Sequence, residues 1–163
     1  MREILDLLHD NAHTSPDRIA ALTGLPVDEV RARIADWEQA GVIRRYKAVV
    51  DWGRLHAIAG TELITALIDV SVIPSRGVGF DDVAARIARF REVRSVYLVS
   101  GAQDLRCVVT GESMREIAEF VVQKLSSLER VQATATHFVL KIYKEDGDSL
   151  LEPELDHRLP VTP

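Results

Sequence analysis

Residues 15–51 contain the pattern that most narrows the folds open to this chain, namely two short amphipathic helices separated by a glycine. The first helix has a clear beginning, because the Ser15 hydroxyl can accept hydrogen bonds from free backbone N–H groups and Pro16 suits the first helical position. Gly24 then gives the backbone the freedom to leave that helix. We therefore expect a tight turn at Gly24, with a second helix directly after it.

The second helix has a single apolar stripe. Val30, Ile34 and Trp37 stand at positions i, i+4 and i+7, and Gly41 ends the helix. Two helices joined in this way predict a helix-turn-helix, a motif whose second helix usually enters the DNA major groove. A small helical core that presents nothing to DNA would have the same spacing, so the motif needs support from neighbouring residues.

A basic segment supplies that support. Cations lie close together around Tyr46, directly after the second helix, and we expect this segment to form a short hairpin, the wing of a winged helix-turn-helix. Cations in a wing can neutralise phosphates while the helix lies in the groove. A solvated charged surface is the alternative interpretation. Together with two arginines of the second helix, the candidate DNA-binding residues are Arg31, Arg33, Arg44, Arg45 and Lys47.

The net charge of −5 is unusual for a protein that binds a polyanion. Asp28 and Glu29, in the first turn of the second helix, suit the helix dipole but would repel phosphates. DNA binding would then depend on local basic patches and on several copies acting together, so the DNA hypothesis itself implies oligomerisation. A sensor or interaction module with little DNA binding is an alternative that the acidic balance favours.

Cys107 is the single cysteine, which excludes an intramolecular disulfide and a cysteine-based metal site, and we expect it to be a small buried hydrophobic residue. The histidines have no metal-ligand spacing, and no phosphate loop or Ser-His-Asp order is present, so we expect neither a metal nor a cofactor. The N-terminus lacks the apolar core of a signal peptide, and no run reaches transmembrane length, which predicts a soluble cytoplasmic protein.

Beyond residue 62 the pattern alternates between strands and helices in the order β-α-β-β-α-β, the ferredoxin-like arrangement. The whole chain is therefore expected to be α+β, a winged helix-turn-helix followed by a ferredoxin-like domain. The expected elements are, in order, Leu63–Ile73, Phe80–Phe90, Val93–Ser100, Leu105–Thr110, Met114–Leu128 and Val131–Tyr143. The predicted boundaries are residues 1–51 for the DNA-binding domain, 52–61 for a hinge, 62–145 for the second domain and 146–163 for an acidic tail.

The first and last expected strands of this domain are apolar on both faces. Residues 63–73 and 131–143 do not alternate apolar with polar residues, whereas two helices can cover only one face of the predicted sheet. The second face must then also be covered, most simply by an identical sheet across a two-fold axis. This pattern favours a homodimer, with the acidic tail mobile or lying along a partner subunit.

The order and spacing of these pieces resemble the leucine-responsive/asparagine-responsive (Lrp/AsnC, or feast/famine) regulators over nearly all of residues 1–145. The segments that carry the resemblance are ILDLLHDNAHTSPDRIAALTGLPVDEVRARI, GVIRRYKAVVD, VRSVYLVSGAQDLRCVVTG and ATATHFVLKIYKE. The resemblance implies a sequence-specific transcriptional regulator that binds double-stranded DNA. It also implies a dimer through the C-terminal domain, frequent assembly into octamers, and control by a small-molecule effector, commonly an amino acid.

The resemblance places the effector at the turn between the second and third strands, where Gly101 and Asp104 match residues that recur in the family. Backbone N–H groups of a glycine turn can hold a carboxylate, and Asp104 can hold an ammonium group. An ordinary hairpin turn would also favour Gly and Asp. The candidate effector-binding residues are Ser100, Gly101, Ala102, Gln103, Asp104, Thr134 and Thr136, the two threonines being equally compatible with a solvent-facing strand.

Two departures from the family pattern concern the DNA-binding half: Pro26 stands where a serine cap is usual, and Arg45 where a glycine is common. An enzymatic alternative also exists, because sirohaem decarboxylases share this architecture and place a histidine-containing segment at the second strand. The corresponding residues 94–100 contain Tyr97 and no histidine. We therefore expect a regulator and not an enzyme.

Overall fold

The computed structural model describes residues 2–60, 62–73 and 79–151. The chain forms two compact units. Within the described residues, the first unit combines residues 2–50 with residues 143–151, and the second unit takes the residues between 51 and 142. The chain therefore passes from one unit to the other twice, since residues 143–151 group with the N-terminal unit.

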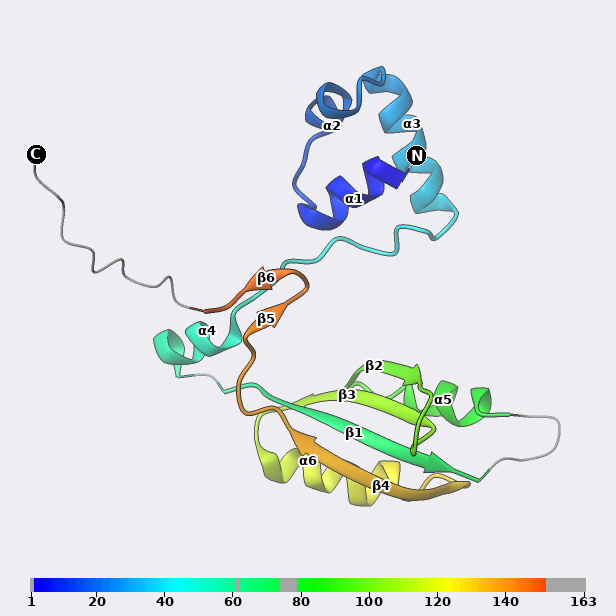
Figure 1. The fold of residues 1–163 in the computed structure, drawn as a ribbon. Coiled ribbons are helices and arrows are strands. Elements are labelled where there is room, and N and C mark those ends of the chain that lie inside the picture. Colours follow the sequence, from blue (N-terminus) through cyan, green and yellow to red (C-terminus); the bar gives the residue numbers. More distant parts are fainter. Residues whose placement is uncertain (1, 61, 74–78, 152–163) are drawn as a thin grey trace, which may run out of the picture. The chain divides into compact units, whose positions relative to one another are not determined.

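The first unit contains the three helices α1 (Arg2–Asp10), α2 (Pro16–Thr23) and α3 (Val27–Gln39), shown in Figure 1. The Ser15 hydroxyl accepts a hydrogen bond from the Arg18 amide at 3.2 Å, and Gly24 ends α2 with a left-handed φ of 73°. One residue from each helix, Ile4, Ile19 and Val30, is fully buried in a small shared core. The predicted helix pair around Gly24 is confirmed.

The segment after α3 differs from the expected hairpin. Residues 44–50 have no strand assignment and run as irregular backbone (Figure 1). Gly41, with a left-handed φ of 70°, ends α3. It is therefore not available to form the turn of a hairpin within residues 44–50. The sequence Arg44-Arg45-Tyr46-Lys47 contains no Gly, Asn, Asp or Pro, so nothing in it favours a tight hairpin turn.

The predicted hinge also differs, because most of it is the helix α4 (Trp52–Ala59). The Asp51 carboxylate accepts a hydrogen bond from the Arg54 amide at 2.9 Å, which caps the beginning of this helix. Gly60 ends it in the left-handed conformation, with a φ of 67°. Asp51 and Gly60 are residues that could have predicted the two ends of this helix from the sequence. None of its side chains is buried.

The second unit is a four-stranded sheet with the strand order β2-β3-β1-β4, in which all neighbouring strands are antiparallel. Its strands are β1 (Ile64–Val72), β2 (Val93–Leu98), β3 (Leu105–Gly111) and β4 (Val131–Phe138). The helices α5 (Asp81–Ile87) and α6 (Met114–Phe120), the latter continued by the π-helical turn η1 (Val121–Leu125), cover one face of the sheet (Figure 1). The predicted ferredoxin-like order is confirmed.

The core of this unit lies between the sheet and these helices. Its β1 residues are Ala66, Ile68, Val70 and Val72, every second residue of the strand. Cys107 of β3 belongs to the same core, as expected, and burial raises the pKa of its thiol to about 11. The thiol therefore stays protonated at neutral pH and is a hydrophobic side chain rather than a reactive one.

The last strand is shorter than expected. The sequence predicted a strand to Tyr143, but β4 ends at Phe138 and a small hairpin follows, formed by β5 (Lys144–Glu145) and β6 (Asp148–Ser149). Asp146 and Gly147 connect the two short strands with φ values of 45° and 99°. Two successive left-handed residues are typical of a tight two-residue hairpin turn. Most of the predicted acidic tail, residues 152–163, lies outside the described residues.

Candidate DNA and effector sites

The side of α3 opposite its core contact is exposed to solvent. Val30 is buried and Ile34 and Trp37 pack beside it, which leaves Asp28 and Arg31 on the outer side of the helix. The Arg31 guanidinium lies 3.4 Å from the Asp17 carboxylate of α2 and 3.9 Å from the Asp28 carboxylate. A predicted DNA contact thus stands beside two carboxylates in the unbound protein.

Arg33 does not lie on the same side of α3 as Arg31. Residues two apart in a helix point in different directions, and the Arg33 side chain is only 30% exposed, whereas that of Arg31 is 56% exposed. The Arg33 guanidinium forms an ion pair with Glu29, one turn earlier. The sequence predicted both arginines as DNA contacts, and the structure presents Arg31 more openly.

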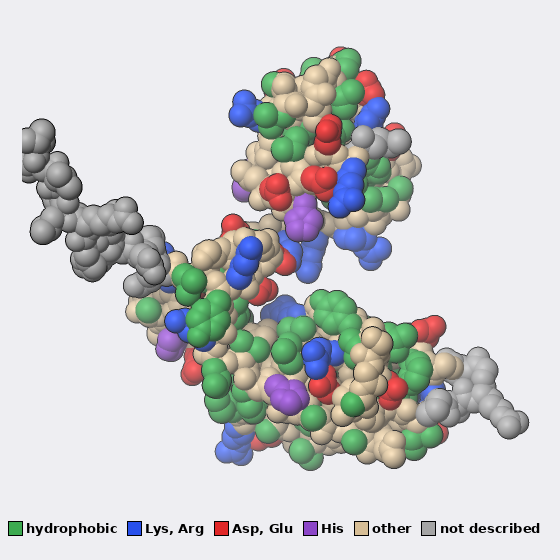
Figure 2. All heavy atoms as spheres, in the orientation of Figure 1, with side chains coloured by type: hydrophobic (Ala, Val, Ile, Leu, Met, Phe, Trp, Pro, Cys, Tyr) green, Lys and Arg blue, Asp and Glu red, His purple; other side chains and the backbone are tan. Residues whose placement is uncertain are grey.

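The cations of the basic segment differ in whether they form an ion pair. Arg44 and Arg45 are exposed and form no ion pair with any residue that the structure describes. Lys47, in contrast, lies with its ammonium group 2.5 Å from the Asp146 carboxylate of the C-terminal hairpin. The Tyr46 hydroxyl donates to Glu38 of α3 at 2.8 Å, which links this segment to the helix. In Figure 2, Lys and Arg side chains gather along the backbone that follows α3.

Two residues that bear on this surface were missed by the sequence analysis. Arg18 of α2 is exposed and has no ion-pair partner within residues 2–60, 62–73 and 79–151. The sequence could have indicated Arg18, because it lies in the first helix of the helix-turn-helix motif. Asp146 stands 99 positions from Lys47, and no local pattern in the sequence connects the two.

The predicted effector turn folds over the end of β1. The Asp104 amide donates to the Val70 carbonyl at 3.2 Å, and the Asp104 carboxylate accepts a hydrogen bond from the Val72 amide at 2.8 Å. The Ser71 hydroxyl and the Gln103 side-chain oxygen are also hydrogen-bonded. Asp104 and Gln103 therefore fix the turn against β1, while residues 100–102 are exposed.

The two predicted threonines lie on a different strand from this turn. Thr134 and Thr136 of β4 are the register partners of the core residues Val70 and Ile68 of β1. Neighbouring register partners share a face of the sheet, so both threonines belong to the face that the helices cover. Both are partly buried, and no hydrogen bond joins either of them to residues 100–104 among the described residues.

On the opposite face of the sheet no helix of the described residues packs, and this face carries a charged group at its centre. Asp69 of β1 accepts two hydrogen bonds from the Arg106 guanidinium of β3, at 2.7 and 2.9 Å. His137 of β4 approaches the same carboxylate, with Nε2 at 3.7 Å. Tyr97, the β2 register partner of Arg106, extends this row and is 53% exposed. In Figure 2 hydrophobic side chains surround charged ones on the sheet unit.

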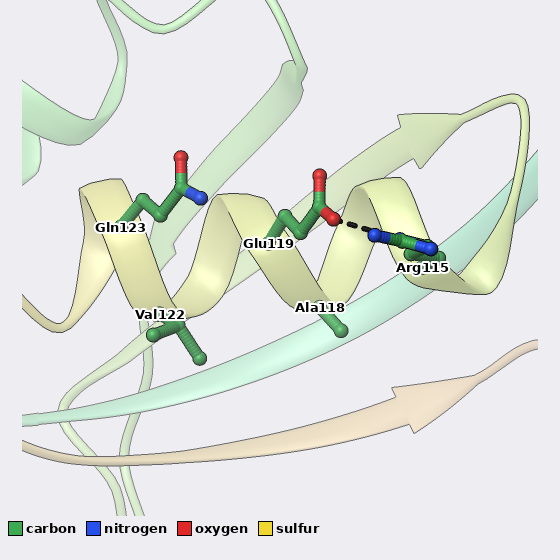
Figure 3. A pocket seen from close by; sticks show the side chains of 5 residues that line it. All are labelled: Arg115, Ala118, Glu119, Val122 and Gln123. Atoms are coloured by element: carbon green, nitrogen blue, oxygen red, sulfur yellow. Dashed lines mark hydrogen bonds and ion pairs between the residues drawn. The ribbon is translucent and has the colours of Figure 1, made fainter.

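One hollow lies on the outer side of α6 and η1 (Figure 3). Ala118 and Val122 form its apolar part, and the Arg115–Glu119 ion pair of 2.8 Å borders it. It shares no residue with the predicted effector turn. Within residues 2–60, 62–73 and 79–151, no three side chains form a group that could hold a metal ion. No helix in that part of the chain is long and apolar enough to cross a bilayer.

Comparisons with known proteins match both units. A family model described as the Lrp/AsnC ligand binding domain matches residues 65–149, and one described as winged helix-turn-helix DNA-binding matches residues 1–44. The uncharacterized HTH-type transcriptional regulator YugG of Bacillus subtilis is 48% identical over 161 residues, which cover 99% of this chain and 95% of that protein.

Two solved structures share the fold. A transcriptional regulator from Neisseria meningitidis in complex with L-methionine has a TM-score of 0.68 and 24% identity, over 93% of this chain and 92% of that chain. The feast or famine regulatory protein of M. tuberculosis complexed with L-methionine has a TM-score of 0.69 and 23% identity, over 92% of this chain and 96% of that chain. Identities at this level establish the fold and do not transfer a ligand.

Proposed function

The chain belongs to the Lrp/AsnC family of transcriptional regulators and is not an enzyme of the decarboxylase type; on that premise, we propose how it binds DNA and an effector. The DNA contacts are Arg31 of α3 together with the basic segment from Arg44 to Lys47. The observation that carries this proposal is the pair Arg44 and Arg45, which are exposed directly after α3 and have no carboxylate partner among the described residues.

Salt dependence tests the DNA contacts. Fragments bound by the protein are first selected from genomic DNA, and the affinity is then measured by fluorescence anisotropy across a salt series. Each lost phosphate contact reduces the slope of log K against log salt concentration by about 0.9. We expect Arg44→Gln with Arg45→Gln to reduce that slope by about 1.8, on the basis of two contacts. Arg89→Gln, an exposed arginine of the second unit, is the matched control.

Two outcomes would contradict the proposal. An unchanged slope in the double variant would remove the basic segment from the DNA interface. Failure of the wild-type protein to select any fragment at low salt would favour the sensor module with little DNA binding. That second candidate is favoured by Asp28, whose side chain is 94% exposed at the beginning of α3, where phosphates would approach.

We further propose a homodimer that buries the open face of the sheet, with octamers as a higher assembly. Leu67 and Val108, register partners on β1 and β3, lie on this face and give it an apolar centre beside Asp69 and Arg106. A dimer also places two DNA-binding units on one assembly, which compensates for the few cations of each unit. Sedimentation equilibrium of the wild type and Val108→Glu tests it, because a carboxylate in this buried centre should favour the monomer.

The proposed effector is an amino acid held at the turn formed by residues 100–104. The backbone N–H groups of the exposed residues Gly101 and Ala102 can hold its carboxylate, and the second oxygen of the Asp104 carboxylate can hold its ammonium group. Two fold relatives were solved with L-methionine, which makes this the first amino acid to test. Calorimetric titration with a panel of amino acids measures binding directly. Retention of binding in Asp104→Asn would remove the ammonium contact from the proposal.

A further inference from the structure

The C-terminal hairpin belongs to the DNA-binding unit although it follows the last strand of the sheet in sequence. Residues 143–151 group with residues 1–50, whereas β4 belongs to the second unit. The hairpin is closed by the register pair Lys144 and Ser149 and by a hydrogen bond of 3.0 Å from the Leu150 amide to the Tyr143 carbonyl. Asp146 stands at its tip. A segment continuous with the sheet unit thus delivers a carboxylate to the DNA-binding unit.

The position of this carboxylate is defined by the turn. Asp146 has a φ of 45° and Gly147 a φ of 99°, the left-handed conformations of a tight turn, in which Asp and Gly are both tolerated. The Asp146 carboxylate lies 2.5 Å from the Lys47 ammonium group. Lys47 holds the pKa of Asp146 below its usual value, chiefly through this hydrogen bond, and the nearby His9 acts in the same direction. The carboxylate is therefore ionised at neutral pH.

The cations of the basic segment are consequently unequal. Arg44 and Arg45 have no carboxylate partner within the described residues, whereas Lys47 is paired with a carboxylate from the other end of the chain. The Lys47 and Asp146 side chains are 63% and 39% exposed. A pair so open to water is weak, and a phosphate could replace the carboxylate at little cost.

We propose that Asp146 competes with DNA phosphate for Lys47, so that the tip of the C-terminal hairpin lowers the DNA affinity of this protein. The proposal rests on the proposed DNA binding. In the unbound protein the hairpin occupies Lys47, and a phosphate must displace Asp146 or leave Lys47 unused. Because the hairpin continues from β4, a movement of residues 139–143 that withdraws Asp146 would add one cation to the DNA surface.

The test compares Asp146→Asn with Asp148→Asn on a fragment selected by the wild-type protein. Both substitutions remove one negative charge from the same hairpin, but Asp148 has no ion pair among the described residues. Asparagine tolerates the left-handed conformation of residue 146, so the turn is retained. For Asp146→Asn we expect DNA binding to tighten about two- to fivefold at low salt, and the slope against log salt concentration to steepen by about 0.9. For Asp148→Asn we expect no change of slope.

Repeating the two aspartate substitutions in the Lys47→Gln variant shows whether Asp146 acts through Lys47. If Asp146 acts through Lys47, Asp146→Asn changes the affinity of Lys47→Gln no more than Asp148→Asn does. Equal effects of the two aspartate substitutions in the wild-type background would overturn the proposal, as would an Asp146→Asn effect that survives in Lys47→Gln. Either result leaves wild-type DNA binding intact and so refutes the competition alone. Absence of DNA binding by the wild type would instead overturn both the proposed function and the competition.

Discussion

The two units hold their charged side chains in different ways. In the sheet unit the Asp69 side chain is 10% exposed and accepts two hydrogen bonds from Arg106. In the DNA-binding unit Lys47 and Asp146 are joined through an exposed pair. Water screens the second pair but not the Asp69 carboxylate, so only the Asp69–Arg106 pair can contribute strongly to stability. The Asp69–Arg106 pair therefore stabilises the sheet unit, whereas the Lys47–Asp146 pair can exchange its carboxylate for another anion.

The hydrophobic core of the DNA-binding unit is also smaller than that of the sheet unit. Among the described residues, the DNA-binding unit buries Ile4, Ile19 and Val30, whereas the cluster of the sheet unit has twelve buried members. A small core offers few neighbours to compensate for a lost side chain. The structure of the DNA-binding unit should therefore be the more easily lost of the two.

The largest expected effect is that of Ile19→Ala, which removes a third of this small set of buried residues. Truncating a buried isoleucine to alanine costs about 2–5 kcal/mol, and we expect this loss to unfold the DNA-binding unit and abolish DNA binding. Trp37 packs against this core, so its fluorescence in a Trp52→Phe background reports the unfolding. Ile68→Ala in the larger core is the matched truncation, and DNA binding by Ile19→Ala at wild-type affinity would contradict the comparison.

Asp69→Asn should have the next largest effect. It leaves Arg106 without its charged partner. In the separate chain the Arg106 side chain is 47% exposed and can be solvated, so at protein concentrations that favour the monomer we expect a loss of about 1–3 kcal/mol in the free energy of unfolding. Urea titration of the sheet unit measures this loss. The matched variant is Glu119→Gln, which breaks an ion pair with Arg115 in which the two side chains are 51% and 88% exposed. Equal losses of unfolding free energy in the two variants would show that the buried carboxylate of Asp69 makes its ion pair no more stabilising than an exposed one.

The same residue predicts a pH dependence. The hydrogen bonds from Arg106 hold the pKa of Asp69 below its ordinary value of 3.8, and His137 acts in the same direction. A lowered pKa in the folded state means that the stabilisation is complete above pH 3.8 and is lost as the pH falls through the lower folded-state pKa. Asp69→Asn should therefore reduce stability at neutral pH while weakening the acid-induced loss.

The order of the elements could be predicted from the sequence because local signals specify it. Ser15 and Gly24 mark the ends of α2, the apolar run of residues 63–73 marks β1, and the alternating residues 105–109 mark β3. The helix α4 was missed although Asp51 and Gly60 mark its ends, because the glycine at position 53 favoured a hinge. The shortening of β4 could not be predicted, since its Thr, Val and Ile residues favour a strand beyond Phe138.

The candidate sites were less predictable than the fold. The cations could be found as residue types, but their partners depend on which segments meet in space. Arg31 meets Asp17 across the helix pair, and Lys47 meets Asp146 across nearly the whole chain. The face on which Thr134 and Thr136 lie depends on the register between β4 and β1, which no local pattern specifies.

The smallest expected effects concern two helix caps, one in each unit. Ser15 accepts from the Arg18 amide at 3.2 Å, and Ser113 accepts from the Glu116 amide at 3.1 Å. Replacing either serine by alanine should cost about 1 kcal/mol, and replacement by aspartate, which retains a cap, should cost less. If the units unfold separately, then in the Trp52→Phe background Ser15→Ala lowers only the midpoint reported by Trp37, and Ser113→Ala lowers only that of the sheet unit. A common shift of both midpoints would show that the two units unfold together, and the smaller core would then be stabilised by the larger one.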